Sequence, residues 1–408
     1  MHFFSQYKGL RKENYILFLG RIVTNLGSMV WPVLTLILNQ KLGMSATGVA
    51  LVTIVSGILL LPAGLMGGRL ADKYNKRNCI IICDLISIFF YIICAVIPLS
   101  YVTIALIIVA AACQSMEYPA YNALIADITY TKDRERAFSL QYLGANIGLI
   151  ASPTIAGVLF KNYLWLAFLI SGIAIGVSTF LIFWQVRDIE PVKEEETESA
   201  YQENRDGDSL IQVLKDHKVI LLYIIGMGLY GAAYQQYGYL MPLDMGRLHG
   251  ENGAVIFGSV SSLNCVVVVL FTPLFTRIFA KMTHTKKSLL GQVMLLVGYA
   301  VFLLMLGNIP AYYVAITLFT FGEILTTIVN GPYLTARIPA SHRGRMNGFM
   351  TVVQSVLQGT FLYVVGVFYD NLGSTAAWVL VIGVLLLAIL LGIILIVCDK
   401  KKYHELYE

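Results

Sequence analysis

Two carboxylic acids lie deep inside stretches of the sequence that are otherwise almost wholly apolar. Glu117 stands in QSMEYPAY and Glu323 in FTFGEILTT. A charge inside an apolar medium is costly, so an acid kept there is expected to face a cavity, a partner or a substrate. Burial favours the neutral carboxyl, which can release its proton when a substrate binds nearby. Both acids are therefore candidates for proton coupling, and the alternative for each is a neutral, hydrogen-bonded packing residue.

Polar and aromatic side chains in similar stretches are candidates to line a substrate path. Gln114 and Tyr121 share a helical face with Glu117, and Gln354 shares a face with Gln358. Aromatic rings and amides can hold an amphipathic, aromatic or cationic solute by stacking, cation–π contact and hydrogen bonding. The full set of candidate lining residues is Asn25, Gln114, Tyr121, Tyr230, Tyr234, Gln235, Gln354 and Gln358.

Two further charges, Arg21 and Asp84, lie about two helical turns inside their apolar stretches. They can form a structural ion pair if their helices meet. The long arginine side chain can instead extend toward the membrane surface. We favour a structural role for both residues over a role in coupling.

Other chemistries lack their residue patterns. The six cysteines lie almost entirely in apolar stretches, without the spacing of a zinc site or a disulfide framework. The sequence has no GxxxxGK(S/T) loop and no HExxH motif, and no GxSxG motif stands at a strand-to-helix turn. We therefore expect a protein that is not an enzyme and that holds neither a metal nor a cofactor.

Membrane-spanning helices must position these residues. Of the 408 residues, 57% are hydrophobic and 13% are charged, and the mean hydropathy is +0.72, beyond the range of an ordinary soluble domain. The apolar runs reach about 20 residues, enough for a helix to cross a hydrocarbon core of roughly 30 Å. The sequence therefore predicts an all-α polytopic membrane protein. The twelve expected spans lie near 15–38, 47–68, 79–98, 101–124, 138–160, 163–186, 219–242, 254–278, 288–307, 310–334, 346–368 and 375–397.

The loops between the runs predict the orientation. With the N-terminus in the cytoplasm, Lys41, Lys161 and Arg247 fall in outer loops and nearly all other basic residues lie on the inner side, where they are preferred. Both termini are therefore expected in the cytoplasm, in a protein of the cell membrane. The net charge of +5 reports this topology and does not indicate nucleic-acid binding.

A long polar segment divides the runs six and six. Residues 187–217 carry an acidic cluster and are predicted to be a solvated cytoplasmic linker between a bundle at 1–186 and a bundle at 218–408. The two halves also resemble each other, since ADI at 126–128 returns as ARI at 336–338 after about 210 residues. This repeat predicts two pseudo-symmetric six-helix bundles.

The stretch GGRLADKYNKR at 67–77 resembles the signature loop between the second and third helices of the major facilitator superfamily. Asn75 stands where the family has glycine, and asparagine tolerates left-handed backbone angles better than other residues with a side chain. The resemblance covers the whole chain and implies a latch on the cytoplasmic side, in which Asp72 accepts a hydrogen bond from Lys76. The latch residues that it implies are Gly67, Asp72, Lys76, Arg77, Asp127 and Arg134. The alternative is a set of ordinary loop charges at the membrane surface.

The fifth run contains a pattern of small residues and proline, LGANIGLIASPTIAGVLF. It resembles the motif in the fifth helix of the superfamily's exporters, and the matching residues are Gly144, Gly148, Pro153 and Gly157. Glycine and proline there can bend the helix and let it rock, whereas plain helix packing would need the same small residues.

The setting of Glu323 resembles the tenth helix of multidrug:proton antiporters from Gram-positive bacteria. The resemblance implies a proton-coupled exporter of amphipathic or cationic drugs, working by alternating access as a monomer in the lipid bilayer. Its expected partners are a small-molecule substrate and protons. The fourth run departs from this pattern, because it lacks the early arginine that many drug:proton exporters carry. The alternatives are a carrier of a specific metabolite, such as a siderophore, sugar or peptide, and a non-transporting membrane sensor.

Overall fold

The computed structural model describes residues 7–130, 133–186, 214, 218–338 and 343–404. Within these residues, twelve helical stretches are long and apolar enough to cross a membrane, so the predicted all-α architecture is confirmed. The first half contains α1 (Lys12–Leu26), α2 (Val30–Leu36), the π-helix η2 (Ile37–Lys41), α3 (Ala46–Lys73), α4 (Lys76–Val96), α5 (Tyr101–Asp127), α6 (Arg134–Phe160) and α7 (Leu164–Gln185). The second half contains α9 (Lys218–Tyr234), the 3-10 helix η4 (Gln235–Tyr237), α10 (Leu240–His249), α11 (Asn252–Ile278), α12 (His284–Leu304), α13 (Ile309–Thr335), α14 (Arg343–Leu372) and α15 (Ser374–Lys402).

The chain groups into two compact units. The first comprises Met1–Gly43, Val52–Glu196 and Met245–Val266, and the second comprises Met44–Leu51, Thr197–Asp244 and Val267–Glu408. The expected linker at 187–217 lies outside the described residues except for Leu214. A division at this linker therefore stays a prediction.

Two short segments join the unit of the other half because of specific contacts. The start of α11 belongs to the first unit, where a side-chain carbon on Gly157 of α6 would collide with the Ala254 backbone. The start of α3 belongs to the second unit, where the Asp370 carboxylate accepts hydrogen bonds from the backbone N–H groups of Ala46 and Thr47 at 2.9 and 2.8 Å.

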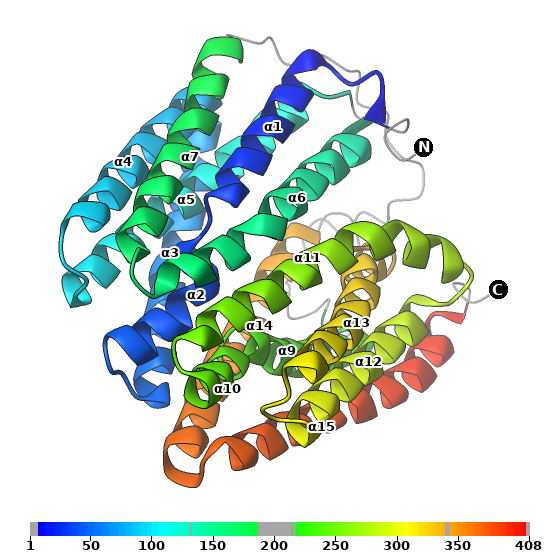
Figure 1. Ribbon diagram of the computed structural model, residues 1–408. Helices are drawn as coiled ribbons and strands as arrows, with labels where there is room; N and C mark the ends of the chain where they lie inside the picture. Colours follow the sequence, from blue (N-terminus) through cyan, green and yellow to red (C-terminus); the bar gives the residue numbers. More distant parts are fainter. Residues whose placement is uncertain (1–6, 131–132, 187–213, 215–217, 339–342, 405–408) are drawn as a thin grey trace. The chain divides into compact units, whose positions relative to one another are not determined.

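Close helix packing builds the first unit around α1. In this unit α1 packs against α6 and α7, and α4 packs against α5 and α7 (Figure 1). A side-chain carbon on Gly144 would lie 2.8 Å from the Phe18 ring, and one on Gly148 would collide with the Ile22 carbonyl. Small residues thus let α6 approach α1, as is usual between helices in lipid.

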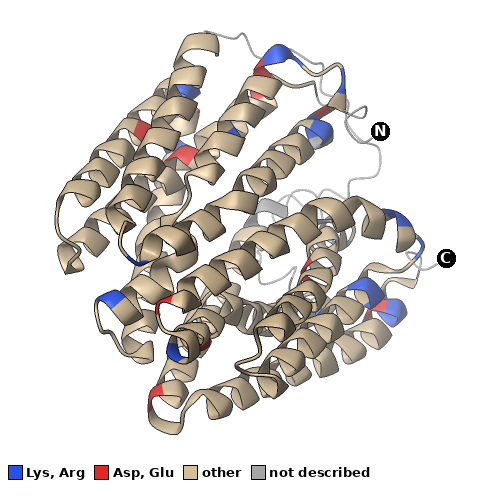
Figure 2. Ribbon diagram, viewed as in Figure 1, with Lys and Arg blue, Asp and Glu red and all other residues tan. Residues whose placement is uncertain are grey.

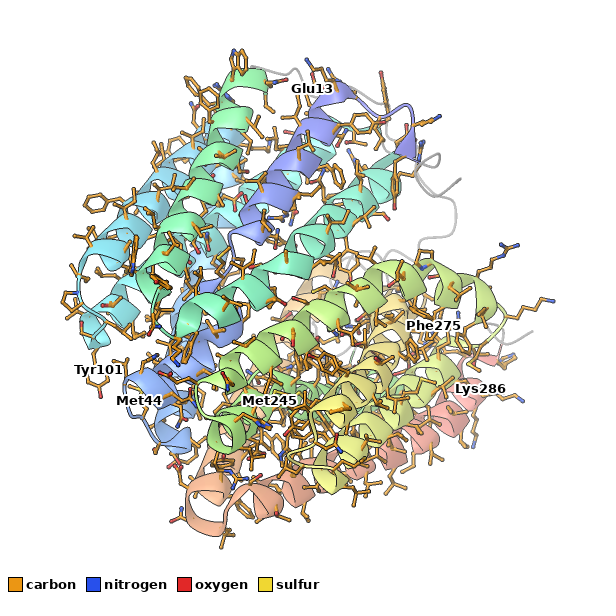
Figure 3. The ribbon with its side chains drawn as sticks, in the orientation of Figure 1. Glu13, Met44, Tyr101, Met245, Phe275 and Lys286 are labelled. Carbon is orange, nitrogen blue, oxygen red and sulfur yellow. The ribbon has the colours of Figure 1, made fainter. Side chains whose placement is uncertain are left out.

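The second unit is built in the same way. Here α9 packs against α14 and α15, and α12 packs against α13. Gly291 of α12 and Gly322 of α13 face each other so closely that neither could carry a side chain. A cluster of Val268, Phe275, Ile324 and Leu325 joins α11 to α13, and Phe275 is labelled in Figure 3.

The outer surface of the helices suits lipid. Large apolar side chains are widely exposed, as in Leu65 at 74%, Val96 at 80% and Leu304 at 83%. Soluble monomers seldom expose so much apolar surface. Figure 2 shows Lys, Arg, Asp and Glu mainly near helix ends, with a few inside the spans. The chain is a multi-pass membrane protein.

Two of the twelve spans are interrupted. The span Lys12–Lys41 breaks at residues 27–29, between α1 and α2, and the span Lys218–His249 breaks at residues 235–239, between α9 and α10. The two breaks are repeat-related, since they are separated by about 210 residues. Interrupted helices at corresponding positions of two halves often mark substrate and ion sites, because the break frees backbone groups.

Candidate functional site

A polar cavity of about 180 Å³ lies inside the first unit. Charged side chains reach it from three helices, with Arg21 on α1, Asp84 on α4 and Glu117 on α5. The residues that line it are Arg21, Thr24, Asn25, Gly27, Ser28, Asp84, Tyr91, Gln114, Glu117, Tyr118, Tyr121, Ser171, Ile175 and Ser178. The cavity therefore brings together four of the residues predicted from sequence: Asn25, Gln114, Glu117 and Tyr121.

Asp84 is held in place by a neighbouring helix. Its side chain is buried, and its Oδ2 atom accepts a hydrogen bond from the Thr179 hydroxyl on α7 at 2.7 Å. Thr179 and the cavity-lining Ser171 and Ser178 were not singled out from sequence, although their spacing places them on one face of α7. Hydroxyl groups in an apolar helix are a weak signal, because they also bond to their own backbone.

Glu117 is buried but not paired. It is 9% exposed, and among the described residues its carboxyl has no hydrogen-bond or ion-pair partner. Most buried polar groups are hydrogen-bonded. The packing alternative for Glu117 predicts such a bond, and the described part of the chain does not supply one.

Arg21 is held by aromatic rings. Its guanidinium carbon lies 4.6 Å from the ring centroid of Tyr121 and 5.3 Å from that of Tyr118. The expected ion pair with Asp84 does not form among the described residues, because Arg21 stacks on these rings. Arg21 lines the same cavity as both Asp84 and Glu117.

The charges of the cavity do not balance when both acids are ionised. Two carboxylates and one guanidinium leave a net charge of −1, which one proton or one monovalent cation neutralises. An uncompensated charge within a membrane protein is costly. One added positive charge, whether a proton or a monovalent cation, would therefore balance the cavity.

Glu323 lies in a different environment, in the second unit. Its Oε1 atom accepts a hydrogen bond from the Tyr234 hydroxyl at 2.8 Å, and the Tyr234 ring stacks on Phe319 with centroids 5.2 Å apart. Tyr230, one turn earlier on α9, is hydrogen-bonded to Thr326 at 2.7 Å. The acid is thus anchored in a group of aromatic rings.

The three amide side chains predicted to line a substrate path in the second unit, those of Gln235, Gln354 and Gln358, lie in different surroundings. The Gln358 amide of α14 packs closely against Gly231 of α9, between Tyr230 and Tyr234 in sequence. Gln354 is half-buried one turn before Gln358. Gln235 lies in η4, and its Oε1 atom is buried with no hydrogen-bond partner in the described residues.

The predicted latch differs from expectation in its pairing. Lys76 Nζ lies 2.7 Å from Asp127 Oδ2, joining α4 to α5, while Asp72 is exposed. Asn75 has a φ of −60°, not a left-handed angle, because its side chain caps α4 by accepting from the Asn78 N–H at 3.2 Å. Asn75 therefore does not use the left-handed angles that asparagine tolerates.

The remaining predicted latch residues are Gly67 on α3, Arg77 on α4 and Arg134 on α6. A side-chain carbon on Gly67 would collide with the Met116 backbone, so α3 and α5 are in close contact. The Arg77 guanidinium donates to the Phe183 carbonyl of α7, and Arg134 is exposed at the start of α6. Their latch role stays a prediction.

The small residues of α6 are packing contacts in this structure. Gly144 and Gly148 touch α1, and Gly157 touches the start of α11. The Pro153 carbonyl would collide with a side-chain carbon on Gly258. Rocking of α6 stays a prediction.

The second unit contains a buried ion pair that sequence reasoning missed. Arg337 donates from Nε and Nη2 to both oxygens of Asp399, at 2.8 and 2.6 Å, and the Tyr333 hydroxyl donates to Asp399 at 2.8 Å. The Arg337 and Asp399 side chains are 3% and 0% exposed. The one sequence signal for a charged residue here is the internal repeat, in which Arg337 occupies the position that matches Asp127.

Comparisons with known proteins agree with this architecture. The family model described as Major Facilitator Superfamily matches residues 17–361. A Na(+), Li(+), K(+)/H(+) antiporter of Planococcus maritimus is 26% identical over 346 residues, which are 78% of this chain and 80% of that protein. The uncharacterized MFS-type transporter YqjV of Bacillus subtilis (strain 168) is 27% identical over 329 residues, 79% of this chain and 78% of that protein.

Solved structures share the fold at low sequence identity. A crystal structure of a POT family transporter in complex with 5-aminolevulinic acid has a TM-score of 0.78 and 14% identity, covering 97% of both chains. The crystal structure of the nucleoside transporter NupG has a TM-score of 0.72 and 12% identity, covering 93% of this chain and 98% of that one. At these identities the likeness shows the fold alone.

Proposed function

Because the chain belongs to the Major Facilitator Superfamily, a family of membrane transporters and not of enzymes, we propose that it is a proton-coupled antiporter that exports a cationic substrate. The observation that carries this proposal is the cavity lined by two acids, Asp84 and Glu117, and only one basic side chain, Arg21. One proton and one cation compete there for the same excess negative charge.

The proposed cycle uses Glu117 as the group that exchanges protons. When a cation enters, Glu117 loses its proton and the cavity stays electrically balanced. When the cation leaves on the other side, a proton takes its place. The two movements are coupled as antiport, because a cavity that holds neither a proton nor a cation retains an uncompensated negative charge in the membrane interior, which is costly.

The proposal includes alternating access in the cell membrane with both termini cytoplasmic. The distribution of basic residues supports this orientation. The Lys76–Asp127 contact would then lie at the cytoplasmic end of α4 and α5. It joins helices there as a latch would, with Asp72 and Arg134 free to enter the contact in another conformation.

Two classes of cation are candidates. The small polar cavity of the first unit favours an inorganic monovalent cation, and the Planococcus relative is described as an antiporter of such ions. The rings of Tyr234 and Phe319 beside Glu323 favour an amphipathic organic cation such as a drug, through cation–π contact. No observation favours a neutral metabolite over these two classes.

Everted vesicles loaded with a pH-sensitive dye test the proposal. After energisation, addition of sodium, lithium, potassium or tetraphenylphosphonium should release protons from vesicles that contain the protein. Glu117→Gln, which keeps the shape of the side chain but not its charge, should abolish the response.

The matched control is Glu13→Gln, which removes an acid from the first turn of α1, outside the cavity. Glu13 is labelled in Figure 3. Its variant should respond like the wild type. No response of the folded wild-type protein to any of these cations would overturn the proposal.

A further inference from the structure

The interruption of the first span releases backbone oxygen at the cavity. In a continuous helix the Ser28 N–H would donate to the Thr24 carbonyl, but here it donates to the Asn25 carbonyl at 3.1 Å. The next N–H, on Met29, donates to the Gly27 carbonyl at 2.8 Å. The Thr24 carbonyl is thus released from its helical partner, and Thr24 lines the cavity.

The Asn25 side chain offers a second oxygen. Its Nδ2 atom donates to the Arg21 carbonyl at 2.9 Å, which fixes the amide against α1. One hydrogen of the amide nitrogen is therefore used, and Asn25, which lines the cavity, retains its amide oxygen as an acceptor. Asn25 cannot shift easily, because Gly148 of α6 packs against its Cβ atom.

The end of α1 adds a favourable electric field. The last turn of a helix carries partial negative charge on its carbonyl groups, which stabilises a nearby cation. Thr24 and Asn25 belong to this last turn, and Gly27 and Ser28 follow it. All four residues line the same cavity as Glu117.

Glu117 supplies the charged oxygen. The side chain is more than nine-tenths buried, lines the cavity and has no hydrogen-bond partner in the described part of the chain. Carboxylate, carbonyl and amide oxygens together are the ligands preferred by hard cations. One missing positive charge in the cavity matches a monovalent ion.

We infer that the broken end of α1 and Glu117 form a binding site for a small monovalent cation, sodium or lithium, with oxygen from Thr24, Asn25 and Glu117. The inference rests on the proposed antiport function and names its substrate class. It uses the break in the first span, whose residues line the same cavity as Glu117, whereas the repeat-related break in the second half directly follows Tyr234, the partner of Glu323.

Equilibrium binding of radioactive sodium to the purified protein in detergent tests the site without transport. The wild type should bind sodium, and lithium should compete for it. Asn25→Ala should weaken binding by about tenfold or more, whereas Asn25→Asp, which keeps an oxygen at this position, should retain it.

The matched control is Asn146→Ala. Asn146 also donates its Nδ2 atom to the carbonyl four residues earlier, at 2.9 Å, but it lies on α6 away from the cavity lining. Sodium binding should be unchanged in this variant. Equal sodium binding by Asn25→Ala and Asn146→Ala, both folded by size-exclusion chromatography, would overturn the inference.

The vesicle assay separates the two proposals. Proton release with tetraphenylphosphonium, together with no binding of sodium or lithium, would support antiport and overturn the inorganic cation site. Sodium binding that depends on Asn25, together with no proton release for any cation, would support the site and overturn antiport.

Discussion

The two halves of the molecule hold their buried acids in different ways. Glu117 in α5 faces a polar cavity with Asp84 and Arg21 and has no hydrogen-bond partner among the described residues. Glu323 in α13 accepts from Tyr234 inside a group of aromatic rings. The two acids lie about one turn apart in repeat-related helices. A shared position in an internal repeat therefore does not imply shared chemistry, and the unpaired acid is the better candidate for exchanging protons.

Neutralising each acid in turn should give the largest difference between the two halves. Glu117→Gln should reduce cation-driven proton movement to the level of vesicles without the protein, because the exchanging group is gone. Glu323→Gln should retain proton movement with sodium and weaken the response to tetraphenylphosphonium. Dye-loaded everted vesicles measure both. Loss of the sodium response in Glu323→Gln but not in Glu117→Gln would reverse the assignment.

The ion pairs of the two halves should differ in their contribution to the free energy of unfolding. Arg337 and Asp399 are almost fully buried, so Arg337→Met removes the positive charge that balances a buried carboxylate and should cost about 3–5 kcal/mol. The side chains of Lys76 and Asp127 are 28% and 31% exposed, so Lys76→Met should cost at most about 1 kcal/mol.

Thermal unfolding of the purified variants in one detergent measures this difference. Both substitutions introduce methionine, at the start of α4 for Lys76 and directly after α13 for Arg337. The difference in stability therefore reports the difference in burial of the two ion pairs. Equal losses of stability would show that the Arg337–Asp399 pair is as well hydrated as the Lys76–Asp127 pair.

The hydroxyl that anchors Glu323 gives a smaller effect. Tyr234→Phe keeps the ring and removes the hydrogen bond to the acid, which should change affinity for tetraphenylphosphonium by about 1 kcal/mol. Tyr230→Phe is the matched control, since its hydroxyl bonds to Thr326 and not to Glu323. Fluorescence titration with the purified protein measures the affinities, and identical values for the two variants would argue against Glu323 as a site for organic cations.

Hydropathy was sufficient to predict the twelve spans because burial in lipid requires long apolar helices whatever their packing. It did not predict the break at residues 27–29. A glycine at position 27 is compatible with both a continuous and an interrupted helix. The glycine is required by the packing against α7, where Ala174 leaves no room for a side-chain carbon on residue 27 and the Ser171 hydroxyl donates to the Gly27 carbonyl.

The candidate site was predictable only in part. Glu117, Gln114 and Tyr121 share one helical face and could be grouped from spacing. Spacing within one helix says nothing about which other helices lie opposite, so Arg21 and Asp84 were interpreted as structural. The stacking of Arg21 on Tyr121, and not on a carboxylate, depends on the packing of α1 against its neighbours.

A contact in the loops gives the smallest expected effect. Glu251, between α10 and α11, bridges Lys161 and Lys41, with oxygen–nitrogen distances of 3.3 and 3.4 Å. Hydrogen bonds from Lys161 and then Lys41 lower the pKa of Glu251 from its ordinary value of 4.5. The contact therefore contributes stability above about pH 4.5, which is lost as the pH falls through the lowered pKa of the folded state.

Comparison with Glu251→Gln measures this contribution. The melting temperature of the wild type should slightly exceed that of the variant at neutral pH, and the difference should disappear in acid. Glu13→Gln, which alters an acid paired with Arg11 at 3.8 Å, is a control for general loss of charge. A difference that grows as the pH falls would contradict the assigned direction.

Proton release on cation binding is the most direct measure of proton–cation exchange at Glu117. Sodium is added to the purified protein in weakly buffered detergent solution, and the released protons are counted with a pH indicator. We expect about one proton per bound sodium in the wild type, since one charge replaces another, and none in Glu117→Gln. Equal proton release by the wild type and Glu117→Gln would contradict the exchange of a proton for a cation at Glu117.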